Sequence, residues 1–331
     1  MKEILNNLFE HKTLSKEIAK EVLVNIASAK YNPSQVAAFM SVYLMRSITV
    51  EEFSGFREAM LELCLKTKFD TNETIDIVGT GGDGKNTFNI STLSCFVAAG
   101  AGIKVTKHGN YGVSSVSGSS NVLEKIGVKF TNDSSVLNKQ LNETGVCFMH
   151  APMFHPAMKN VAPVRKELGV RTFFNLLGPI VNPSRPKYML LGTYNLEIMR
   201  LYNYLLQGTD HDYTIIHALD GYDEISLTGN FKMISKNTEQ IIEPQQLGLS
   251  LLNEKELHGG NSIDESAELF MKILNGTGTK AQNEVVIANA GMAIHCVKQQ
   301  QSLMDCVNGA RESLENKKAL NVYNKLIKIN G

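Results

Sequence analysis

The stretch that decides the fold is Ile75-Asp-Ile-Val78, which runs into Gly79-Thr-Gly-Gly-Asp-Gly84 before an apolar helix begins near Ser91. A short β-branched run, a glycine turn and a helix in this order are typical of an α/β unit. Backbone N–H groups in such a turn and the positive end of the helix dipole lie together, which favours phosphate binding. The stretch therefore predicts a strand, a phosphate-binding loop and a helix.

Two common nucleotide-binding motifs fit the glycines of this loop and fail on their next requirement. Gly79, Gly81 and Gly84 match the dinucleotide pattern, but the acid expected about 20 residues later for the ribose is absent. Lys85 completes most of a Walker A loop, but Asn86 stands where Ser or Thr would hold magnesium. For this loop alone, a plain tight turn remains the alternative to phosphate binding.

A second loop of the same kind follows residues 103–106. It reads Lys107-His-Gly-Asn-Tyr-Gly112-Val-Ser-Ser-Val-Ser-Gly-Ser-Ser120, and a helix is expected from near Asn121. No Asp or Glu occurs between Gly84 and Leu123, so both loops lie in an acid-free stretch. A flexible serine-rich loop is the alternative, but two neighbouring anion-binding loops favour a substrate with phosphate groups at both ends.

Paired carboxylates follow another buried run, residues 213–219, in Asp220-Gly-Tyr-Asp223-Glu224. Adjacent carboxylates repel one another unless a cation or a donor separates them. Magnesium is usually held by one or two carboxylates together with substrate phosphates. A solvated acidic turn is the alternative for this pair taken alone.

The spacing of apolar residues divides the chain into segments that are helical only and segments in which strands and helices alternate. Residues 1–70 have helical spacing only, and Thr49 with Glu52 forms a capping-box pattern. From Thr74, short β-branched runs (75–78, 103–106, 213–217 and 285–287) alternate with helical stretches, which indicates a mainly parallel sheet flanked by helices. Residues 155–186 interrupt this alternation with helical spacing and five prolines.

We therefore expect an α/β fold with an additional small all-helical domain, joined by hinge segments. The small domain comprises residues 1–70 and about 155–190, and the large domain comprises 71–154 and about 191–331. The tail from Ser302 to Ile329 has amphipathic helical spacing, which favours packing over a functional role.

Composition excludes several classes of protein. The 331 residues contain 33 Lys plus Arg and 33 Asp plus Glu, so no basic excess favours nucleic acid. Five scattered cysteines without a C-x-x-C pattern argue against a disulfide framework and favour a reducing compartment. Neither a signal peptide nor a stretch of roughly 20 apolar residues is present, so we expect a cytoplasmic protein without membrane or nucleic-acid partners.

Taken together, these motifs are similar to those of the anthranilate phosphoribosyltransferases. The similar blocks follow the family's order from the first glycine loop to the C-terminal region: Gly79-Thr-Gly-Gly-Asp83, Thr87-Phe-Asn-Ile-Ser-Thr92, Lys107-His-Gly-Asn110, Gly118-Ser119, Val122-Leu-Glu124, His155-Pro-Ala-Met-Lys159, Val161-Ala-Pro-Val-Arg165-Lys-Glu-Leu-Gly169, Arg171-Thr-Phe-Phe-Asn175-Leu-Leu-Gly-Pro179, Asp220-Gly-Tyr-Asp-Glu224-Ile-Ser226 and Asn289-Ala-Gly.

The resemblance implies a homodimer formed through the helical domain and a reaction between anthranilate and phosphoribosyl pyrophosphate, with about two Mg²⁺ ions per chain. It assigns phosphoribosyl pyrophosphate to Gly79, Gly82, Asp83, Thr87, Asn89, Ile90, Ser91, Thr92, Lys107, His108, Gly109, Asn110, Tyr111, Gly112, Val113, Ser114, Ser115 and Ser119. It assigns Mg²⁺ to Ser91, Asp223 and Glu224, and anthranilate to Asn110 and Arg165. No covalent nucleophile is implied; His108 either lies near the amine or orders its loop.

Two alternatives remain open at this stage. Pyrimidine nucleoside phosphorylases share the fold, and a non-catalytic binding protein on the same scaffold is a further class. Tyr111 and Asn121 depart from the family, which usually has Arg and Asp there. The double change is compatible with a swapped structural contact, in which the Tyr111 side chain points away from the substrates and only its backbone lines the loop.

Overall fold

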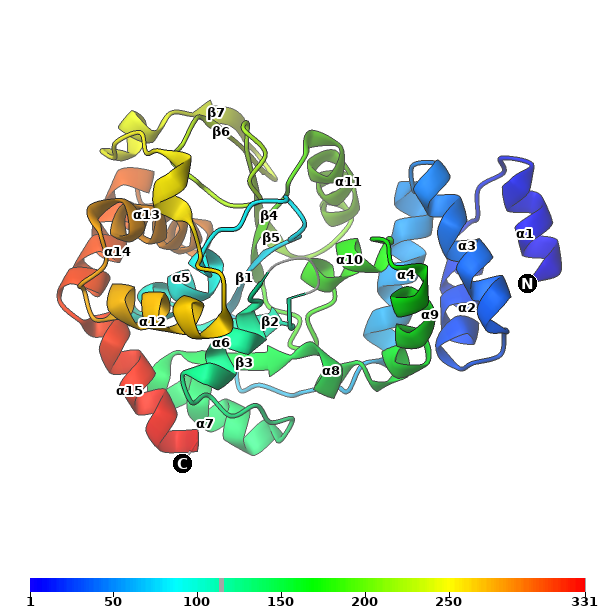
Figure 1. The fold of residues 1–331 in the computed structure, drawn as a ribbon, viewed down its shortest axis with the longest axis horizontal. Helices are drawn as coiled ribbons and strands as arrows, with labels where there is room; N and C mark the ends of the chain where they lie inside the picture. The colour runs from blue at the N-terminus through cyan, green and yellow to red at the C-terminus, as the bar shows by residue number, and fades with distance from the viewer. Residues whose placement is uncertain (113–115, 331) are drawn as a thin grey trace. The chain divides into compact units, whose positions relative to one another are not determined.

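The computed structural model describes residues 1–112 and 116–330 of the chain (Figure 1). Contacts between Cα atoms group the chain into two compact units. The helical unit is formed by Met1–Thr67 and Ala151–Pro183, and the α/β unit by Lys68–His150 and Ser184–Gly331. These borders lie a few residues before the positions 70, 155 and 190 expected from the sequence.

The regular structure of the helical unit, in its described residues, consists of helices and short 3₁₀ turns. They are α1 (Lys2–Phe9), α2 (Lys16–Ala27), α3 (Pro33–Met45), α4 (Val50–Leu63), α8 (Ala151–Phe154), η1 (Pro156–Asn160), α9 (Ala162–Leu168), α10 (Phe174–Leu177) and η2 (Gly178–Ile180). An aromatic core joins the two segments, because the rings of Phe56 and Phe173 stack with their centroids 4.6 Å apart.

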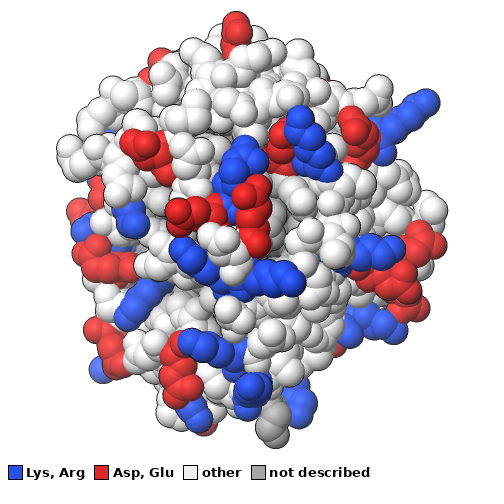
Figure 2. Space-filling view, turned by 90° about the vertical axis from the view of Figure 1, so that its left-hand side faces the viewer, with Lys and Arg blue, Asp and Glu red and all other residues white. Residues whose placement is uncertain are grey.

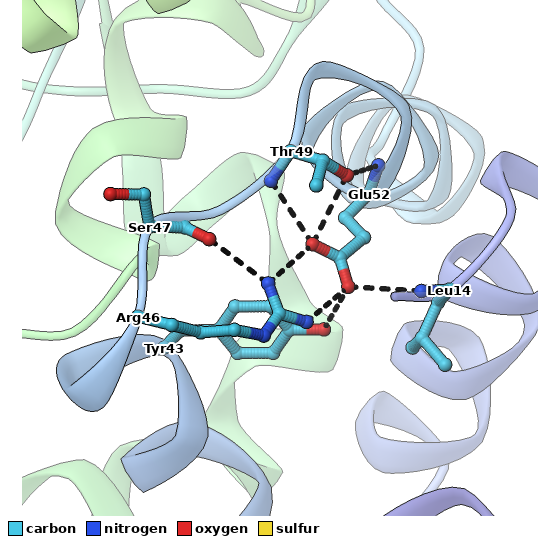
Figure 3. Close-up of polar contacts among 6 residues, drawn as sticks. All are labelled: Leu14, Tyr43, Arg46, Ser47, Thr49 and Glu52. Carbon is cyan, nitrogen blue, oxygen red and sulfur yellow. Dashed lines mark hydrogen bonds and ion pairs between the residues drawn. The ribbon is translucent and has the colours of Figure 1, made fainter. Parts of the chain in front are cut away.

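A buried carboxylate fixes the start of α4 (Figure 3). Thr49 and Glu52 make the capping box predicted from the sequence. The same Glu52 carboxylate accepts hydrogen bonds from the backbone N–H of Leu14, the hydroxyl of Tyr43 and the guanidinium of Arg46. One side chain thus joins the loop before α2, the end of α3 and the first turn of α4.

The α/β unit is built on a seven-stranded sheet in the order β3-β2-β1-β4-β5-β6-β7. The first five strands are parallel: β1 (Ile75–Gly79), β2 (Val105–Gly109), β3 (Val146–His150), β4 (Tyr188–Gly192) and β5 (Asp212–Ala218). The antiparallel strands β6 (Phe231–Ser235) and β7 (Glu239–Ile242) complete it. The predicted mainly parallel sheet is therefore confirmed.

Helices and 3₁₀ turns of the described chain complete this unit, and the longer helices are labelled in Figure 1. They are α5 (Ile90–Gly100), α6 (Ser119–Lys125), α7 (Ser134–Thr144), α11 (Leu196–Gln207), η3 (Pro244–Leu247), η4 (Glu254–Leu257), α12 (Ile263–Leu274), α13 (Lys280–Val297), α14 (Leu303–Glu315) and α15 (Lys318–Asn330). Across residues 1–112 and 116–330, no helix is both long enough and apolar enough to cross a membrane.

One predicted strand is wrong. Residues 285–287 lie inside α13, and each of them is buried. A helix covered on all sides is apolar all round, so its short β-branched runs look like those of a buried strand. The predicted run 103–106 is also displaced, since β2 spans Val105–Gly109.

Charged side chains are interspersed on the face of the molecule drawn in Figure 2. Blue Lys and Arg side chains lie beside red Asp and Glu side chains, and neither sign dominates this face. The surface pattern thus follows the equal totals of acidic and basic residues in the sequence.

Candidate active site

Sheet topology places the site at the carboxyl ends of β1 and β4. From β1 the chain continues to β2, its neighbour toward the β3 edge of the sheet. From β4 it continues to β5, its neighbour toward the opposite, β7 edge. Adjacent strands whose connections diverge in this way form the crevice where open α/β sheets bind ligands. The first glycine loop follows β1 and therefore lies at this switch point.

The first glycine loop requires glycine at several positions. Gly81, Gly82 and Gly84 have φ of 64°, 79° and 76°, a conformation that other residues rarely adopt. A side chain at Gly79 would collide with the carboxylate of Asp223. The loop therefore brings its backbone against an acidic residue that lies far away in the sequence.

The loop leads into α5, whose first turn has no side-chain cap. Asn89 stands at the N-cap position, but its amide donates to the carbonyl of Ser117 at 3.2 Å. Backbone N–H groups at an uncapped helix start are suited to an anion. Ile90, Ser91 and Thr92, all expected phosphate contacts, occupy this first turn.

Three carboxylates come together beside the loop. The N–H of Gly81 donates to Asp223 at 2.6 Å, and the hydroxyl of Thr87 donates to Glu224 at 3.0 Å. Burial raises the pKa of Asp223, and the neighbouring charge of Asp83 raises it further. Burial also raises the pKa of Glu224, with additional contributions from Asp223 and Asp83. Negative charge is thus concentrated where it is poorly solvated.

This donor set fits a hard divalent cation. Oxygen ligands are those that Mg²⁺ prefers, and a cation would offset both the burial and the mutual repulsion that raise the pKa values of these carboxylates. Oδ2 of Asp83 is buried and accepts no hydrogen bond in the described part of the chain. Within the same residues, no three His, Cys, Asp or Glu side chains form a ready metal cage. Substrate phosphate oxygens would therefore have to complete the coordination.

A buried lysine lies in the middle of β2, next to the first turn of α5. The ammonium of Lys107 donates to the carbonyl of Ile77, and it lies 3.5 Å from the hydroxyl of Ser91. The backbone N–H of His108 donates to the Asp76 carboxylate at 3.2 Å, which ties β2 to β1. The His108 side chain is itself buried.

Hydrogen bonds join the two ends of the second glycine loop, residues 110–112 and 118–121, which we call its neck. The carbonyl of Asn110 accepts from the N–H of Ser120 at 3.1 Å and from the hydroxyl of Ser119 at 3.2 Å. The amide oxygen of Asn121 accepts from both Gly112 and Gly118. Three expected contacts, Val113, Ser114 and Ser115, lie outside the described residues.

Arg165 belongs to the helical unit, where it lies on α9. Its guanidinium lies 5.3 Å from the ring centroid of Phe174, and burial lowers its pKa. A 3.4 Å hydrogen bond joins it to the amide oxygen of Asn175, and it forms no ion pair with any described carboxylate. A partly buried guanidinium without an anionic partner is suited to a carboxylate ligand.

Asn289 was missed by sequence reasoning as part of the site. It is buried on α13, and its amide bonds both backbone groups of Ile225, the N–H at 3.0 Å and the carbonyl at 2.8 Å. Ile225 directly follows Glu224, so the amide fixes the backbone beside the carboxylate pair. The available signal was a polar residue inside a long apolar helix, which needs a buried partner.

Comparisons with known proteins define the class of this chain. Residues 71–320 match the α/β domain of the glycosyl transferase family, and residues 2–64 match its helical bundle domain. The chain therefore belongs to the glycosyl transferase family.

Proteins that are similar over the whole chain identify the family within the glycosyl transferases. An anthranilate phosphoribosyltransferase of Flavobacterium johnsoniae is 59% identical over 98% of both chains. The crystal structure of the Thermus thermophilus anthranilate phosphoribosyltransferase is 32% identical, covers 98% of both chains and has a TM-score of 0.92. The Saccharomyces cerevisiae enzyme in complex with phosphoribosyl pyrophosphate and Mg is 25% identical, with a TM-score of 0.90 over 98% of this chain and 96% of that one. The chain belongs to the anthranilate phosphoribosyltransferase family.

Proposed function

We propose that the protein transfers the 5-phosphoribosyl group of phosphoribosyl pyrophosphate to the amine of anthranilate, in tryptophan biosynthesis. The products are N-(5-phosphoribosyl)anthranilate and pyrophosphate. The observation that carries the proposal is the meeting of three carboxylates with a glycine loop and an uncapped helix start. Whole-chain similarity to anthranilate phosphoribosyltransferases supports the choice of acceptor.

Phosphoribosyl pyrophosphate binds, in this proposal, along the two glycine loops. Backbone N–H groups of the first loop and the start of α5 donate hydrogen bonds to one phosphate end, with Thr87, Asn89 and Ser91 nearby. The neck of the second loop, with Asn110 and Ser119, accepts the other. The chain has no acidic residue from Gly84 to Leu123, so the start of α5 and the second loop carry no charge that would repel the substrate.

Asp223, Glu224 and Ser91 hold magnesium together with the substrate's pyrophosphate oxygens. The yeast relative is a complex with phosphoribosyl pyrophosphate and Mg, and we extend that metal, at about two ions per chain, to this protein. When bound, Mg²⁺ neutralises negative charge on the pyrophosphate. The position of Lys107 beside Ser91 supports the same role for its ammonium.

The protein's contribution to the reaction is positioning and electrostatic stabilisation. The amine attacks C1 of the ribose while the bond to pyrophosphate breaks, so positive charge develops on the ribose and negative charge on the leaving group. No side chain is needed as a nucleophile. The amine loses its proton after the C–N bond begins to form, and the aromatic ring makes this proton acidic enough to leave without a strong base.

Anthranilate is recognised, we propose, by Arg165 of the helical unit and by Asn110. The guanidinium fork binds the carboxylate in two places at once. His108 is buried on β2, immediately before the loop, which supports an ordering role for it. We further propose a homodimer through the helical unit and a cytoplasmic location, the latter supported by five buried cysteines that are free thiols.

The test is the loss of anthranilate fluorescence on mixing the purified protein with phosphoribosyl pyrophosphate and Mg²⁺. Loss that requires all three components supports the proposal. Adenine, orotate, and thymidine with inorganic phosphate serve as alternative substrates. Turnover of thymidine with phosphate would establish a phosphorylase instead, and the absence of turnover with every substrate would favour a binding protein.

A further inference from the structure

Residues 257–260, which form a strap across the first glycine loop, are assigned no role by the proposed function. The strap begins at the last residue of η4 and precedes α12 in the α/β unit. It contacts residues 86–88, which connect the glycine turn to α5. Its residues are some 170 positions away in the sequence, as the separation of 172 between Asn86 and His258 shows.

The strap pairs with the loop through backbone hydrogen bonds. The N–H of Gly259 donates to the carbonyl of Asn86 at 2.7 Å, and the N–H of Phe88 donates to the carbonyl of Leu257 at 3.2 Å. These bonds form an antiparallel bridge between Thr87 and His258. The path of the loop is therefore set by a second segment as well as by its own glycines.

Side chains reinforce this pairing. The amide of Asn86 donates to the carbonyl of Gly260 at 2.9 Å and lies 3.1 Å from Nε2 of His258. Lys85 forms an ion pair with Glu254 at 3.0 Å, and its ammonium lies 4.6 Å from the ring centroid of Tyr222. Asn86, which rules out a Walker loop, thus has a structural partner in the strap.

Gly259 leaves no room for a side chain. A Cβ there would lie 2.5 Å from the carbonyl oxygen of Thr87 and 2.8 Å from the N–H nitrogen of Phe88. Both atoms belong to backbone and cannot rotate away, so any substitution must move the strap or the loop.

Thr87 connects this pairing to the carboxylate cluster. Its hydroxyl donates to Glu224 at 3.0 Å, while its backbone is held against the strap. A shift of the loop by a fraction of an ångström would thus move the donor that orients Glu224. Small misplacements of this kind are costly to catalysis because charged groups must be preorganised.

We propose that the strap is a positioning element for the pyrophosphate–magnesium side of the site, acting through Asn86 and Thr87. The proposal rests on the proposed function. It predicts a selective effect: displacing the strap weakens magnesium-dependent binding of phosphoribosyl pyrophosphate and leaves recognition of anthranilate nearly unchanged.

The test compares Gly259→Ala with Gly309→Ala, where a Cβ meets no atom within 4 Å. Titration calorimetry with phosphoribosyl pyrophosphate and Mg²⁺ should show Kd raised about tenfold or more in Gly259→Ala only. In steady-state assays, KM for anthranilate should stay within about twofold of the wild-type value. Hydrogen exchange should report faster exchange of the Phe88 amide in the same variant.

Asn86→Ala provides an independent test if Gly259→Ala does not fold by circular dichroism. It removes two contacts to the strap without adding an atom, and it should also raise Kd for phosphoribosyl pyrophosphate selectively. Unchanged binding in a folded variant, or an equal loss for both substrates, overturns the strap's role while wild-type turnover leaves the proposed function standing. Lack of binding by the wild-type protein overturns both.

Discussion

The hydroxyl of Tyr111 donates a 2.9 Å hydrogen bond to the carboxylate of Glu124, and this bond ties the second glycine loop to α6. The Tyr111 ring also meets His150 edge to face, with centroids 4.6 Å apart. Asn121, the other departure from the family's pattern, instead bonds the loop backbone at Gly112 and Gly118. Each departure therefore has its own structural partner, which favours a structural role for both.

Tyr111→Arg is accordingly expected to change kcat/KM by less than about threefold, a difference under roughly 0.7 kcal/mol. An arginine at this position can pair with Glu124 in place of the phenol. Steady-state kinetics with varied phosphoribosyl pyrophosphate measures the effect, and Tyr111→Phe isolates the contribution of the hydroxyl. A tenfold gain from Tyr111→Arg would mean that the native tyrosine replaces a charged substrate contact.

The sequence predicts the features of this protein that are local in the chain. The glycine loops, the paired carboxylates and the capping box at Thr49 are short patterns with a direct physical meaning, and the structure forms the capping box as expected. The strap across residues 86–88 and the amide of Asn289 join segments that are distant in the chain. No local pattern encodes such contacts, because either partner alone is an ordinary polar or glycine residue.

The error at residues 285–287 has the same origin. A buried helix and a buried strand are both apolar, and only the neighbours of α13 in space decide between them. The absence of acidic residues between Gly84 and Leu123, in contrast, can be read directly from the sequence, because it does not depend on which segments meet in the fold.

Asp223→Asn combined with Glu224→Gln should abolish most activity and leave the fold intact. The pyrophosphate would lose a correctly placed metal, and removing buried like charges relieves repulsion in the free protein. Magnesium titration of the residual activity reports the site, and circular dichroism reports folding. A normal magnesium optimum with near-normal turnover would show that these carboxylates form only an acidic turn.

Arg165→Ala should raise KM for anthranilate far more than KM for phosphoribosyl pyrophosphate. The lost charge-assisted contact is expected to cost on the order of 1.5–3 kcal/mol, about one to two decades in affinity. Arg165→Lys, which keeps the charge but not the planar fork, is the matched control and should recover part of the loss. An unchanged KM for anthranilate would remove Arg165 from the site.

Asn289→Leu should raise the magnesium concentration needed for half-maximal activity several-fold, because the backbone after Glu224 loses both of its amide partners. The substitution also leaves buried backbone groups unpaired, so thermal unfolding should begin at a lower temperature. Asn289→Asp keeps the acceptor for Ile225 but loses the donor, and an intermediate effect is expected. A purely structural residue would lower the melting temperature while leaving the magnesium dependence unchanged.

His155 gives the helical unit a pH-dependent stability. Burial lowers the pKa of this histidine to about 4, and a backbone hydrogen bond to Val181 only partly opposes the shift. In the unfolded chain the same group titrates near its ordinary value of about 6.5. Between these two values the unfolded state binds a proton that the folded state does not.

The stabilising contribution is therefore fully present above about pH 6.5 and falls as the pH is lowered toward 4. At pH 5 the folded protein should have lost about 2 kcal/mol relative to pH 7 through this group alone. Urea unfolding of the wild type and of His155→Gln at both pH values measures the contribution, since other titrating groups cancel in the difference. Equal losses in the two proteins would show that His155 is protonated as readily in the folded chain as in the unfolded one.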